Sequence, residues 1–442
     1  MENSTNPTNA TDASHYDEAL IESNDRSRSL DLRMGIASID YYEDIFSPTL
    51  TAKIVVTTTG NVIDGKGIYQ GLPLRGGERV SLKIAGNVDS NPGLDFSKET
   101  NMFYVSGISN ILSSTNTESF CLNLCSREAI TNETARVVKR YPSSSPLSAT
   151  AQDIINLLAT PKSIKVDQTS NKYAFIGNMR KPFTVLTWLA SKSVPETKGD
   201  ATAGYLFYET QDGFNFRAID KLITEKPVAS YHYTEVSKPE EQRQDDQILS
   251  YSTDKNENML AKLRLGAYSS HRVYFDPYTF EITAPEKRKF KLEDYAGKTK
   301  NLGKRIGLPS IGEGENDNLG DIPTRIVSGI LDRGTLEEGV SAEGNADPLK
   351  YQSQSLMRYN IMFTQSLTMT IPSNTNLKAG NIIECLFPKT TAEAEADEFD
   401  QDQSGLYMIK ELCHHFDTTG SYTSMKLIRD TFGQYGTNTE DN

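Results

Sequence analysis

Residues 377–383 read Leu-Lys-Ala-Gly-Asn-Ile-Ile, and residues 74–80 read Leu-Arg-Gly-Gly-Glu-Arg-Val. Both stretches follow one pattern (Leu, a base, one residue, Gly, two residues, then Val or Ile), and they lie 303 positions apart. The glycine can supply the turn from which a strand begins. The pair therefore suggests that one strand-forming unit occurs twice in the chain.

The match extends beyond the turn. Tyr104 lies 27 residues after Gly77, Tyr407 lies 27 residues after Gly380, and each tyrosine sits in an apolar stretch typical of a strand. We interpret the pattern as a duplication, with coincidence among degenerate β patterns as the alternative. At an offset of 302, three further pairs agree: Phe120 with Tyr422, Arg127 with Arg429, and Glu128 with Asp430.

The duplication predicts two similar antiparallel β-barrel (tube-like) domains in one chain. Strand-rich ends around a helix-containing middle favour an α+β protein that is mostly β, with an intervening helix-containing domain and an irregular insertion. The expected boundaries are a disordered N-terminal arm at 1–29, the first barrel at 30–145, an intervening α+β domain at 146–229, a discontinuous second barrel at 230–296 and 348–437, and an irregular Gly-rich insertion at 297–347.

Local patterns place the expected helices. Thr150 and Asp153 have the spacing of a capping box before an apolar helix. An apolar stripe predicts a second helix over 183–190. A third helix is expected to start at Asp347-Pro348, where an N-cap residue precedes proline.

The length and charge of the chain limit the number of domains and the classes of function to expect. The chain has 442 residues, which at ~150 residues per domain suggests about three domains. Its 59 acidic residues outnumber its 46 basic ones, for a net charge of −13. A surface of that sign repels phosphate, which disfavours a protein that grips nucleic acid and suits one that nucleic acid slides past.

The four cysteines are too few for a disulfide scaffold. We interpret them as small buried hydrophobic residues in a reducing compartment. No run approaches 18 apolar residues, so no transmembrane helix is expected. The polar N-terminus has neither the basic nor the apolar region of a signal peptide, so secretion by that route is not expected.

Asp400-Gln-Asp-Gln-Ser-Gly405, with Glu411 at position 12, matches the spacing of a calcium-binding EF-hand loop. An EF-hand requires a helix after the loop, but residues 406–416 have the pattern of a strand. We therefore favour an acidic hairpin loop over a calcium site. The acidic run at 393–402 is interpreted as a solvated loop rather than a specific partner site.

Other chemical motifs carry little weight. Consecutive strand residues point to opposite faces, so in Cys413-His414-His415 only Cys413 and His415 can share a side, and no partner lies at zinc spacing. The only tryptophan, Trp188, lies on an apolar helical stripe, which favours a core position. The sequence contains no nucleophile elbow and no nucleotide-binding fingerprint. Its many acidic residues do not exclude a pair of carboxylates that could hydrolyse glycosides. We expect no catalytic, cofactor-binding or metal-binding residues.

Several segments, taken in order, resemble the central baseplate hub protein of contractile-tailed (T-even-like) bacteriophages, a family related in fold to the N-terminal part of type VI secretion spike proteins. The resemblance covers residues 30–290 and 350–435. The segments that carry it are Leu377–Ile383, Ser404–Phe416, Tyr422–Gly433, Ala151–Ile155, Pro182–Ala190 and Tyr205–Phe214.

The resemblance implies a homotrimer in which each chain contributes two tube-like barrels to a quasi-sixfold ring. Such a ring would join the sixfold tail tube to the threefold central spike and leave a channel for DNA. It implies a structural protein, not an enzyme, in the virion baseplate, assembled in the host bacterial cytoplasm. The implied partners are itself, the central spike protein, tail tube or tube-initiator proteins and other baseplate proteins. The alternatives are the hub part of another contractile injection system or, in a different class, a virion-associated cell-wall hydrolase.

Overall fold

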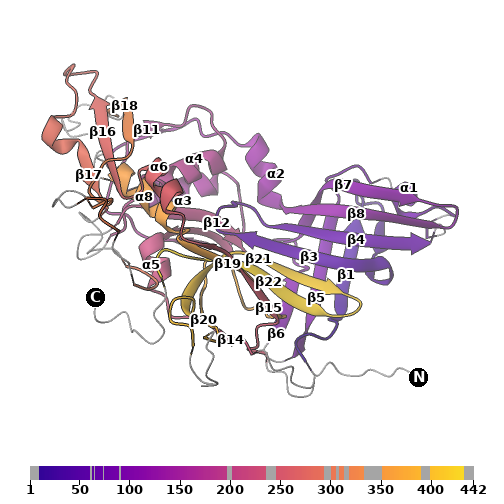
Figure 1. Cartoon of the computed structure of the whole chain (residues 1–442). Helices are drawn as coiled ribbons and strands as arrows, with labels where there is room; N and C mark the ends of the chain where they lie inside the picture. The colour runs from indigo at the N-terminus through magenta and orange to yellow at the C-terminus, as the bar shows by residue number, and fades with distance from the viewer. Residues whose placement is uncertain are drawn as a thin grey trace.

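Most of the regular structure in the computed structural model is β-strand, with shorter helices between the strands (Figure 1). This confirms the expectation of a mostly β protein with some helices. The structure describes residues 9–59, 62–63, 65–72, 74–88, 91–196, 202–234, 245–292, 300–304, 308–312, 318–332, 351–389 and 399–432.

The largest sheet has 14 strands. Three of them branch from its main path, because β6 (Asn91–Phe96) pairs with β5, β20 (Ile382–Leu386) with β21, and β14 (Ser230–His232) with β20. The main path runs through β15 (Ser250–Asn256), β19 (Gln365–Pro372), β22 (Ser421–Arg429), β21 (Gly405–Asp417), β3 (Ile36–Asp44), β4 (Thr51–Thr59), β8 (Thr117–Ser126), β7 (Phe103–Ser113), β5 (Arg79–Val88), β1 (Tyr16–Glu22) and β2 (Ser29–Asp31).

One order of five strands occurs twice in this sheet. The order β3-β4-β8-β7-β5 is matched by β15-β19-β22-β21-β20, and every neighbouring pair in both is antiparallel. Gly77 (φ +91°) precedes β5 and Gly380 (φ +88°) precedes β20, in a backbone conformation that glycine adopts without strain. We call these two sets of strands the first and the second half-sheet.

The strand register corrects one match within the repeat. Val80 lies opposite Phe103, and Ile383 lies opposite Tyr407, so the counterpart of Tyr407 is Phe103 and not Tyr104. Phe103 and Tyr407 are both buried in the core, whereas Tyr104 points to the other face of its strand. A shift of one residue reverses the face, so the two tyrosines agree in type but not in position.

The last match of the repeat also differs between the halves. Arg127 and Glu128 begin the helix α2 (Arg127–Thr134), whereas Arg429 ends β22 and Asp430 follows it. The expected strand ending in Arg and an acid is therefore present only in the second half-sheet.

Strand pairing also corrects the expectation of two separate barrels. The 13-residue strand β21 pairs with β20 through its first part and with β3 through its last part, so the two half-sheets form one continuous sheet. Over the described residues, strand pairing closes neither half-sheet into a barrel. The length of β21 is the physical reason for the continuous sheet. A strand that extends beyond its neighbour leaves part of its edge free to pair with another strand.

Each half-sheet covers its own hydrophobic core, but the cores are not independent. Ile54, Phe103 and Leu122 belong to the first core, and Met369, Tyr407 and Leu427 belong to the second. Phe416 lies on β21 of the second half-sheet yet is fully buried in the first core. The two cores are therefore connected through the β3–β21 pair.

The intervening residues form a small α/β unit. Its sheet contains β10 (Ile164–Val166), β13 (Gly213–Ala218) and β12 (Tyr205–Thr210), and the helices α3 (Leu147–Asn156) and α4 (Pro182–Ala190) share its hydrophobic core. The expected helix over 183–190 is confirmed, and Trp188 packs edge-on against Tyr173 and Phe175.

The expected capping box does not form. The helix α3 starts after Pro146, so Thr150 lies within the helix and is buried. The side chain of Asp153 instead accepts a hydrogen bond from Tyr141 at 2.9 Å. Tertiary packing here overrides the local capping signal.

The region after β15 differs from the expected boundaries. The strand β16 (Ser269–Phe275) pairs with β17 (Lys289–Lys291) and, in parallel, with β18 (Ile326–Ile330), in a sheet separate from the second half-sheet. Residues 326–330 of the expected irregular insertion thus form a strand. Its pairing partner β16 lies about fifty residues earlier in the chain, so no local pattern indicated this strand. The expected helix start at Asp347-Pro348 lies outside the described residues, and α8 spans Ser353–Ile361.

The N-terminal arm is also partly ordered. Within residues 9–29, β1 adds to the edge of β5, and Ala19 and Ile21 are fully buried in the first core. Polar composition suggested disorder, but the alternating apolar residues of this short strand have a sheet edge to cover. Residues 1–8 lie outside the described part of the chain.

The remaining elements are short and lie between the larger ones. They are η1 (Arg33–Gly35), α1 (Ile68–Gly71), β9 (Arg140–Tyr141), β11 (Phe175–Ile176), α5 (Ile219–Ile223), α6 (Met259–Leu265) and η3 (Pro285–Lys287). Among the described residues, no helix is long and apolar enough to cross a membrane.

Candidate functional site: the junction of the two half-sheets

The seam between β3 and β21 is the most distinctive feature of the fold. It is an antiparallel pair in which Ser38 lies opposite Asp417 and Asp44 lies opposite Glu411. On the core side, the rings of Tyr41 and His414 are stacked with centroids 5.9 Å apart and planes 3° apart. Burial lowers the pKa of His414 to about 4, so this ring is neutral at pH 7.

The opposite side of the seam, which we call the outer face, is polar. His415 Nδ1 lies 2.5 Å from Asp40 Oδ1, and Cys413 Sγ lies 3.9 Å from the same oxygen. The adjacent residues Cys413, His414 and His415 thus alternate between faces as strand geometry requires. In the described part of the chain, no three His, Cys, Asp or Glu side chains converge in a way that could hold a metal ion.

A buried carboxylate joins three parts of the molecule. Glu43, on β3, accepts hydrogen bonds from the Tyr41 hydroxyl at 2.7 Å, the Gln211 backbone N–H at 2.7 Å and the Ala379 backbone N–H at 2.8 Å. These partners come from the first half-sheet, the intervening unit and the turn before β20. Burial raises the pKa of Glu43 to about 7, and the three donors only partly oppose that shift.

The turn that carries the sequence repeat is packed against the intervening unit. A Cβ atom on Gly380 would lie 2.5 Å from the Tyr208 hydroxyl, so only glycine permits this approach. Beside it, Lys378 Nζ lies 2.5 Å from Asp212 Oδ2, and Gln211 Nε2 donates to the Thr375 carbonyl at 2.8 Å. The glycine pattern found in the sequence thus marks an inter-unit contact as well as a turn.

A second buried polar cluster fastens the intervening unit to the first half-sheet. Lys162 Nζ lies 2.5 Å from Glu209 Oε1 and 2.8 Å from Glu128 Oε2. The other oxygen of Glu209 accepts from the Leu50 N–H at 2.9 Å and the Ser126 hydroxyl at 2.7 Å. Burial raises the pKa of Glu209, opposed by Lys162. A lysine and acids with this many fixed partners are suited to positioning rather than to proton transfer.

A third cluster anchors α8. The fully buried Arg358 contacts Asp430 Oδ2 at 2.8 Å and Asp220 Oδ1 at 3.1 Å, and it donates to the Lys300 carbonyl at 2.8 Å. Asp430 is the acid that follows the last strand of the repeat. Asp430 belongs to the sequence repeat, but its partner Arg358 lies on a different element, α8, with no local signal in the sequence.

The stretch that resembles an EF-hand loop has another geometry. Asp400 Oδ1 accepts hydrogen bonds from the backbone N–H groups of Asp402 at 2.8 Å and Gln403 at 3.0 Å, and β21 begins at Gly405. Glu411 lies on that strand, where its carboxylate contacts Lys426 at 3.1 Å. A strand, not a helix, follows the loop, as expected for a hairpin. Residues 390–398, which hold most of the acidic run, lie outside the described residues.

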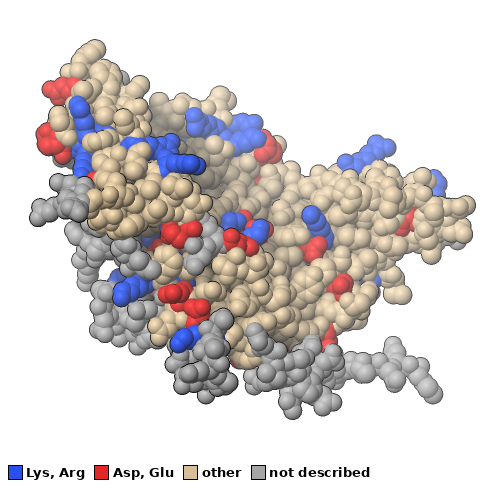
Figure 2. Space-filling view, in the orientation of Figure 1, with Lys and Arg blue, Asp and Glu red and all other residues tan. Residues whose placement is uncertain are grey.

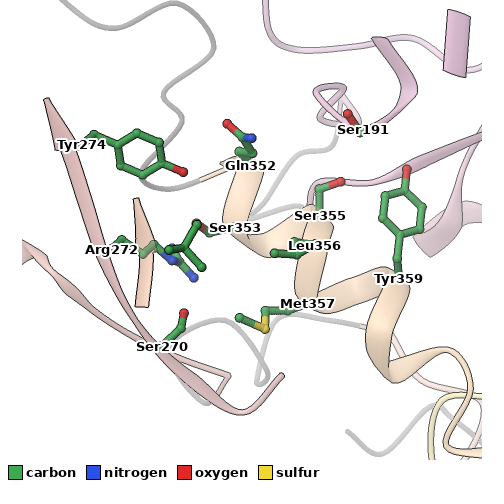
Figure 3. A pocket seen from close by; sticks show the side chains of 11 residues that line it. Ser191, Ser270, Arg272, Tyr274, Gln352, Ser353, Ser355, Leu356, Met357 and Tyr359 are labelled. Atoms are coloured by element: carbon green, nitrogen blue, oxygen red, sulfur yellow. The ribbon is translucent and has the colours of Figure 1, made fainter. Parts of the chain in front are cut away.

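A small pocket of about 160 Å³ lies between β16 and α8 (Figure 3). Ser270, Arg272 and Tyr274 line it from β16, and the guanidinium of Arg272 lies 3.5 Å from the Phe290 ring centroid. None of its described lining residues is His, Cys, Asp or Glu, so it offers no acid–base pair. The pocket is lined by Ser191, Ser270, Arg272, Tyr274, Val327, Gln352, Ser353, Ser355, Leu356, Met357 and Tyr359.

Charge is unevenly spread over the visible surface. Charged side chains of both signs gather around β16, β17 and β18, whereas few lie over β3, β4, β7 and β8 (Figure 2). On the outer face of β3, β4, β15, β19, β21 and β22, Ser and Thr are frequent, and the described carboxylates outnumber the described lysines. The carboxylates on β3, β15 and β21 are Asp40, Asp44, Asp254, Glu411 and Asp417, and the lysines on β4, β21 and β22 are Lys53, Lys410 and Lys426.

The fold is similar to that of two tail proteins of known structure. The chain is similar to a tail protein from Neisseria meningitidis MC58, with 10% identity, a TM-score of 0.53, and coverage of 93% of this chain and 96% of that one. It is also similar to the 43 kDa tail protein of prophage MuSo2 from Shewanella oneidensis, with 9% identity, a TM-score of 0.52, and coverage of 94% and 98%. No protein-family model and no curated protein sequence matches the chain. The likeness to these two tail proteins is one of fold.

Proposed function

We propose that this protein is the structural hub of a contractile phage tail baseplate. In this proposal a homotrimer forms a quasi-sixfold ring that joins the sixfold tail tube to the threefold central spike. The observation that carries the proposal is the twofold occurrence of the order β3-β4-β8-β7-β5 within one chain. The shared fold with two tail proteins supports it.

The repeat would let a threefold assembly match a sixfold one. A spike with three subunits and a tube with six subunits per ring cannot meet through identical contacts on both sides. Three chains with two similar half-sheets each present six similar surfaces to the tube. The intervening unit and the β16–β18 region occur once per chain, and they present three surfaces to the spike.

The charge of the outer face suits a channel for DNA. Carboxylates such as Asp40 and Asp417 repel phosphate, and Ser and Thr side chains offer no fixed positive charge. We propose that this face lines the lumen, so that DNA passes without specific binding. A ring whose lumen is lined mainly by Lys and Arg would contradict this part of the proposal.

The other parts of the proposal follow from the assembly. The partners are a second and third copy, the central spike protein, tail tube or tube-initiator proteins and other baseplate proteins. The protein would act in the virion, after assembly in the host bacterial cytoplasm, and not as an enzyme. The hub part of another contractile injection system has the same geometry and is the nearest alternative, while a cell-wall hydrolase is the alternative in a different class.

The full chain tests the proposal by size-exclusion chromatography with light scattering and by negative-stain microscopy. We expect a particle near three times 49.1 kDa that appears as a six-lobed ring. A stable monomer that clears peptidoglycan would support the hydrolase instead. A turbidity assay on purified cell walls supplies that second measurement.

A further inference from the structure

Two strands of the repeated order, β15 and β7, have an edge that no other described strand occupies. The strand β15 is the last on the path and pairs only with β19. The strand β7 pairs with β8 on one side, but on the other it meets β5 only at Phe103 and Tyr104. Residues 106–113 of β7 therefore lack a strand neighbour on that side within the described chain.

The seam between the half-sheets shows what such an edge can bind. In the repeated order, β3 and β15 each stand first, and β7 and β21 each stand fourth. The seam joins the first strand of one half-sheet to the fourth strand of the other. Its counterpart would join β15 to β7, but six strands separate β15 from β7 on the path, and the chain does not form that pair.

The two fourth strands also divide their length in the same way. On β21, residues 405–408 pair with β20 and residues 411–417 pair with β3. On β7, residues 103–104 pair with β5, which leaves 106–113 in the position that corresponds to the seam. The open segment is thus the part of β7 that the seam predicts to be in contact.

The open segment carries neither charge nor proline at its free edge, although its pairing with β8 is bulged between Val105 and Gly107 and between Ser109 and Leu112. Natural edge strands carry charges or proline that prevent pairing with another chain. Residues 106–113 read Ser-Gly-Ile-Ser-Asn-Ile-Leu-Ser, with no charge and no proline, and Leu112 is 71% exposed. An uncharged, exposed strand edge is what an interface strand presents before assembly.

We propose that β15 of one copy pairs antiparallel with residues 106–113 of β7 in a second copy. The contact repeats the β3–β21 seam between chains, and three such contacts alternate with three seams to close a ring. This inference rests on the proposed trimer and identifies the strands that hold it together. It predicts that the sheet continues across every boundary between chains.

Charge substitution at the edge tests the pairing. Leu112→Lys and Ser252→Lys each place an ammonium group at one of the two edges, and Ile326→Lys on β18 is the matched control because Ile326 is also 71% exposed. By light scattering, we expect both edge variants to raise the concentration at which half of the trimer dissociates by at least about tenfold, and the control to leave it unchanged. Circular dichroism spectra should match for all four proteins, because Leu112 lies on the surface of the single chain.

Amide hydrogen exchange gives a second readout that needs no substitution. Exchange in peptides covering 106–113 and 250–256 should slow on going from dilute monomer to concentrated trimer, whereas exchange at 326–330 should not. A wild-type trimer that the edge substitutions leave intact, with no protection at 106–113, overturns the strand pairing but leaves the hub proposal standing. A wild-type protein that stays monomeric at every concentration overturns both.

Discussion

The carboxylate of Glu43 accepts a hydrogen bond from the backbone N–H of Ala379 at 2.8 Å, across 336 positions of sequence. Ala379 lies directly before the glycine of the repeated turn, and Glu43 lies on the strand that forms the seam. One buried acid therefore links the repeat, the seam and the intervening unit. Its protonation should be visible in the stability of the whole chain.

Glu43→Gln should change how stability depends on pH. The pKa of Glu43 is raised from 4.5 to about 7 in the folded protein, so its contribution is fully present below pH 4.5 and is lost as pH rises through 7. Relative to wild type, the variant should gain about 3 kcal/mol of unfolding free energy between pH 4.5 and pH 8. Urea unfolding at a series of pH values measures this, and a difference that does not vary with pH would contradict it.

His414→Asn should give the opposite slope. The pKa of His414 is lowered from 6.5 to about 4 by burial, so its contribution is present above pH 6.5 and is lost as pH falls through 4. Asparagine keeps a polar atom near Thr423, which lies 2.9 Å from Nδ1 of the histidine. We expect the difference from wild type to shift in favour of the variant by about 3 kcal/mol as pH falls from 7 to 4. The Glu43→Gln variant is the control, because its slope must have the other sign.

Gly380→Ala should destabilise more than Gly76→Ala, although both residues lie in the repeated turns. Both have positive φ, which costs a residue with a side chain about 1–2 kcal/mol. At Gly76 the nearest atom to an added Cβ is 3.8 Å away, whereas at Gly380 it is the Tyr208 hydroxyl at 2.5 Å. We expect a loss of about 1–2 kcal/mol for Gly76→Ala and about 2–4 kcal/mol for Gly380→Ala in chemical unfolding. Equal losses would mean that the packing of Tyr208 against the turn does not matter.

Arg358→Met should be among the most damaging single substitutions. It leaves the buried Asp430 and the largely buried Asp220 near each other without their shared cation, and loss of one partner of a buried ion pair costs about 3–5 kcal/mol. Arg33→Ala is the control, because Arg33 and Asp31 form an exposed pair at 2.7 Å that water and salt screen, so its loss should change stability little. Thermal unfolding of the two variants should separate them clearly. Similar melting temperatures would show that Arg358 is dispensable.

Calcium should not stabilise the loop at Asp400. Its carboxylate accepts two backbone N–H groups, and Glu411 lies on a strand where Lys426 neutralises it. Isothermal titration of the full chain with calcium should show no binding event in the micromolar range. One site per chain at that affinity would require the loop and the start of β21 to rearrange.

The local parts of the fold were predictable from the sequence. The glycine turns before β5 and β20, the helix α4 and the strand after Asp400 each follow from patterns within about ten residues. The alternation of Cys413, His414 and His415 between two faces followed from strand geometry alone. These features depend on neighbours in sequence, where patterns carry information.

The long-range parts were not predictable, for a physical reason. Nothing near Ile39 indicates that its strand partner is Phe416, and nothing in 326–330 indicates a parallel partner in β16. In the sequence, Glu43 and Arg358 resemble ordinary surface residues. Only the tertiary structure buries them and brings several hydrogen-bond or ion-pair partners to each. The false match of Tyr104 with Tyr407 arose because residue type does not reveal which face of a strand is buried.

The position of Phe416 in the first core has a consequence for synthesis. The ribosome completes β3 and β4 several hundred residues before it makes β21, so the first core must wait for one of its own side chains. At roughly 5–20 residues per second, that wait lasts on the order of tens of seconds. During it, the nascent chain exposes an unpaired β3 edge and an incomplete core. The first half-sheet therefore cannot complete its core until β21 has been made, and chaperone dependence should be set by the time needed to synthesise the residues between β4 and β21.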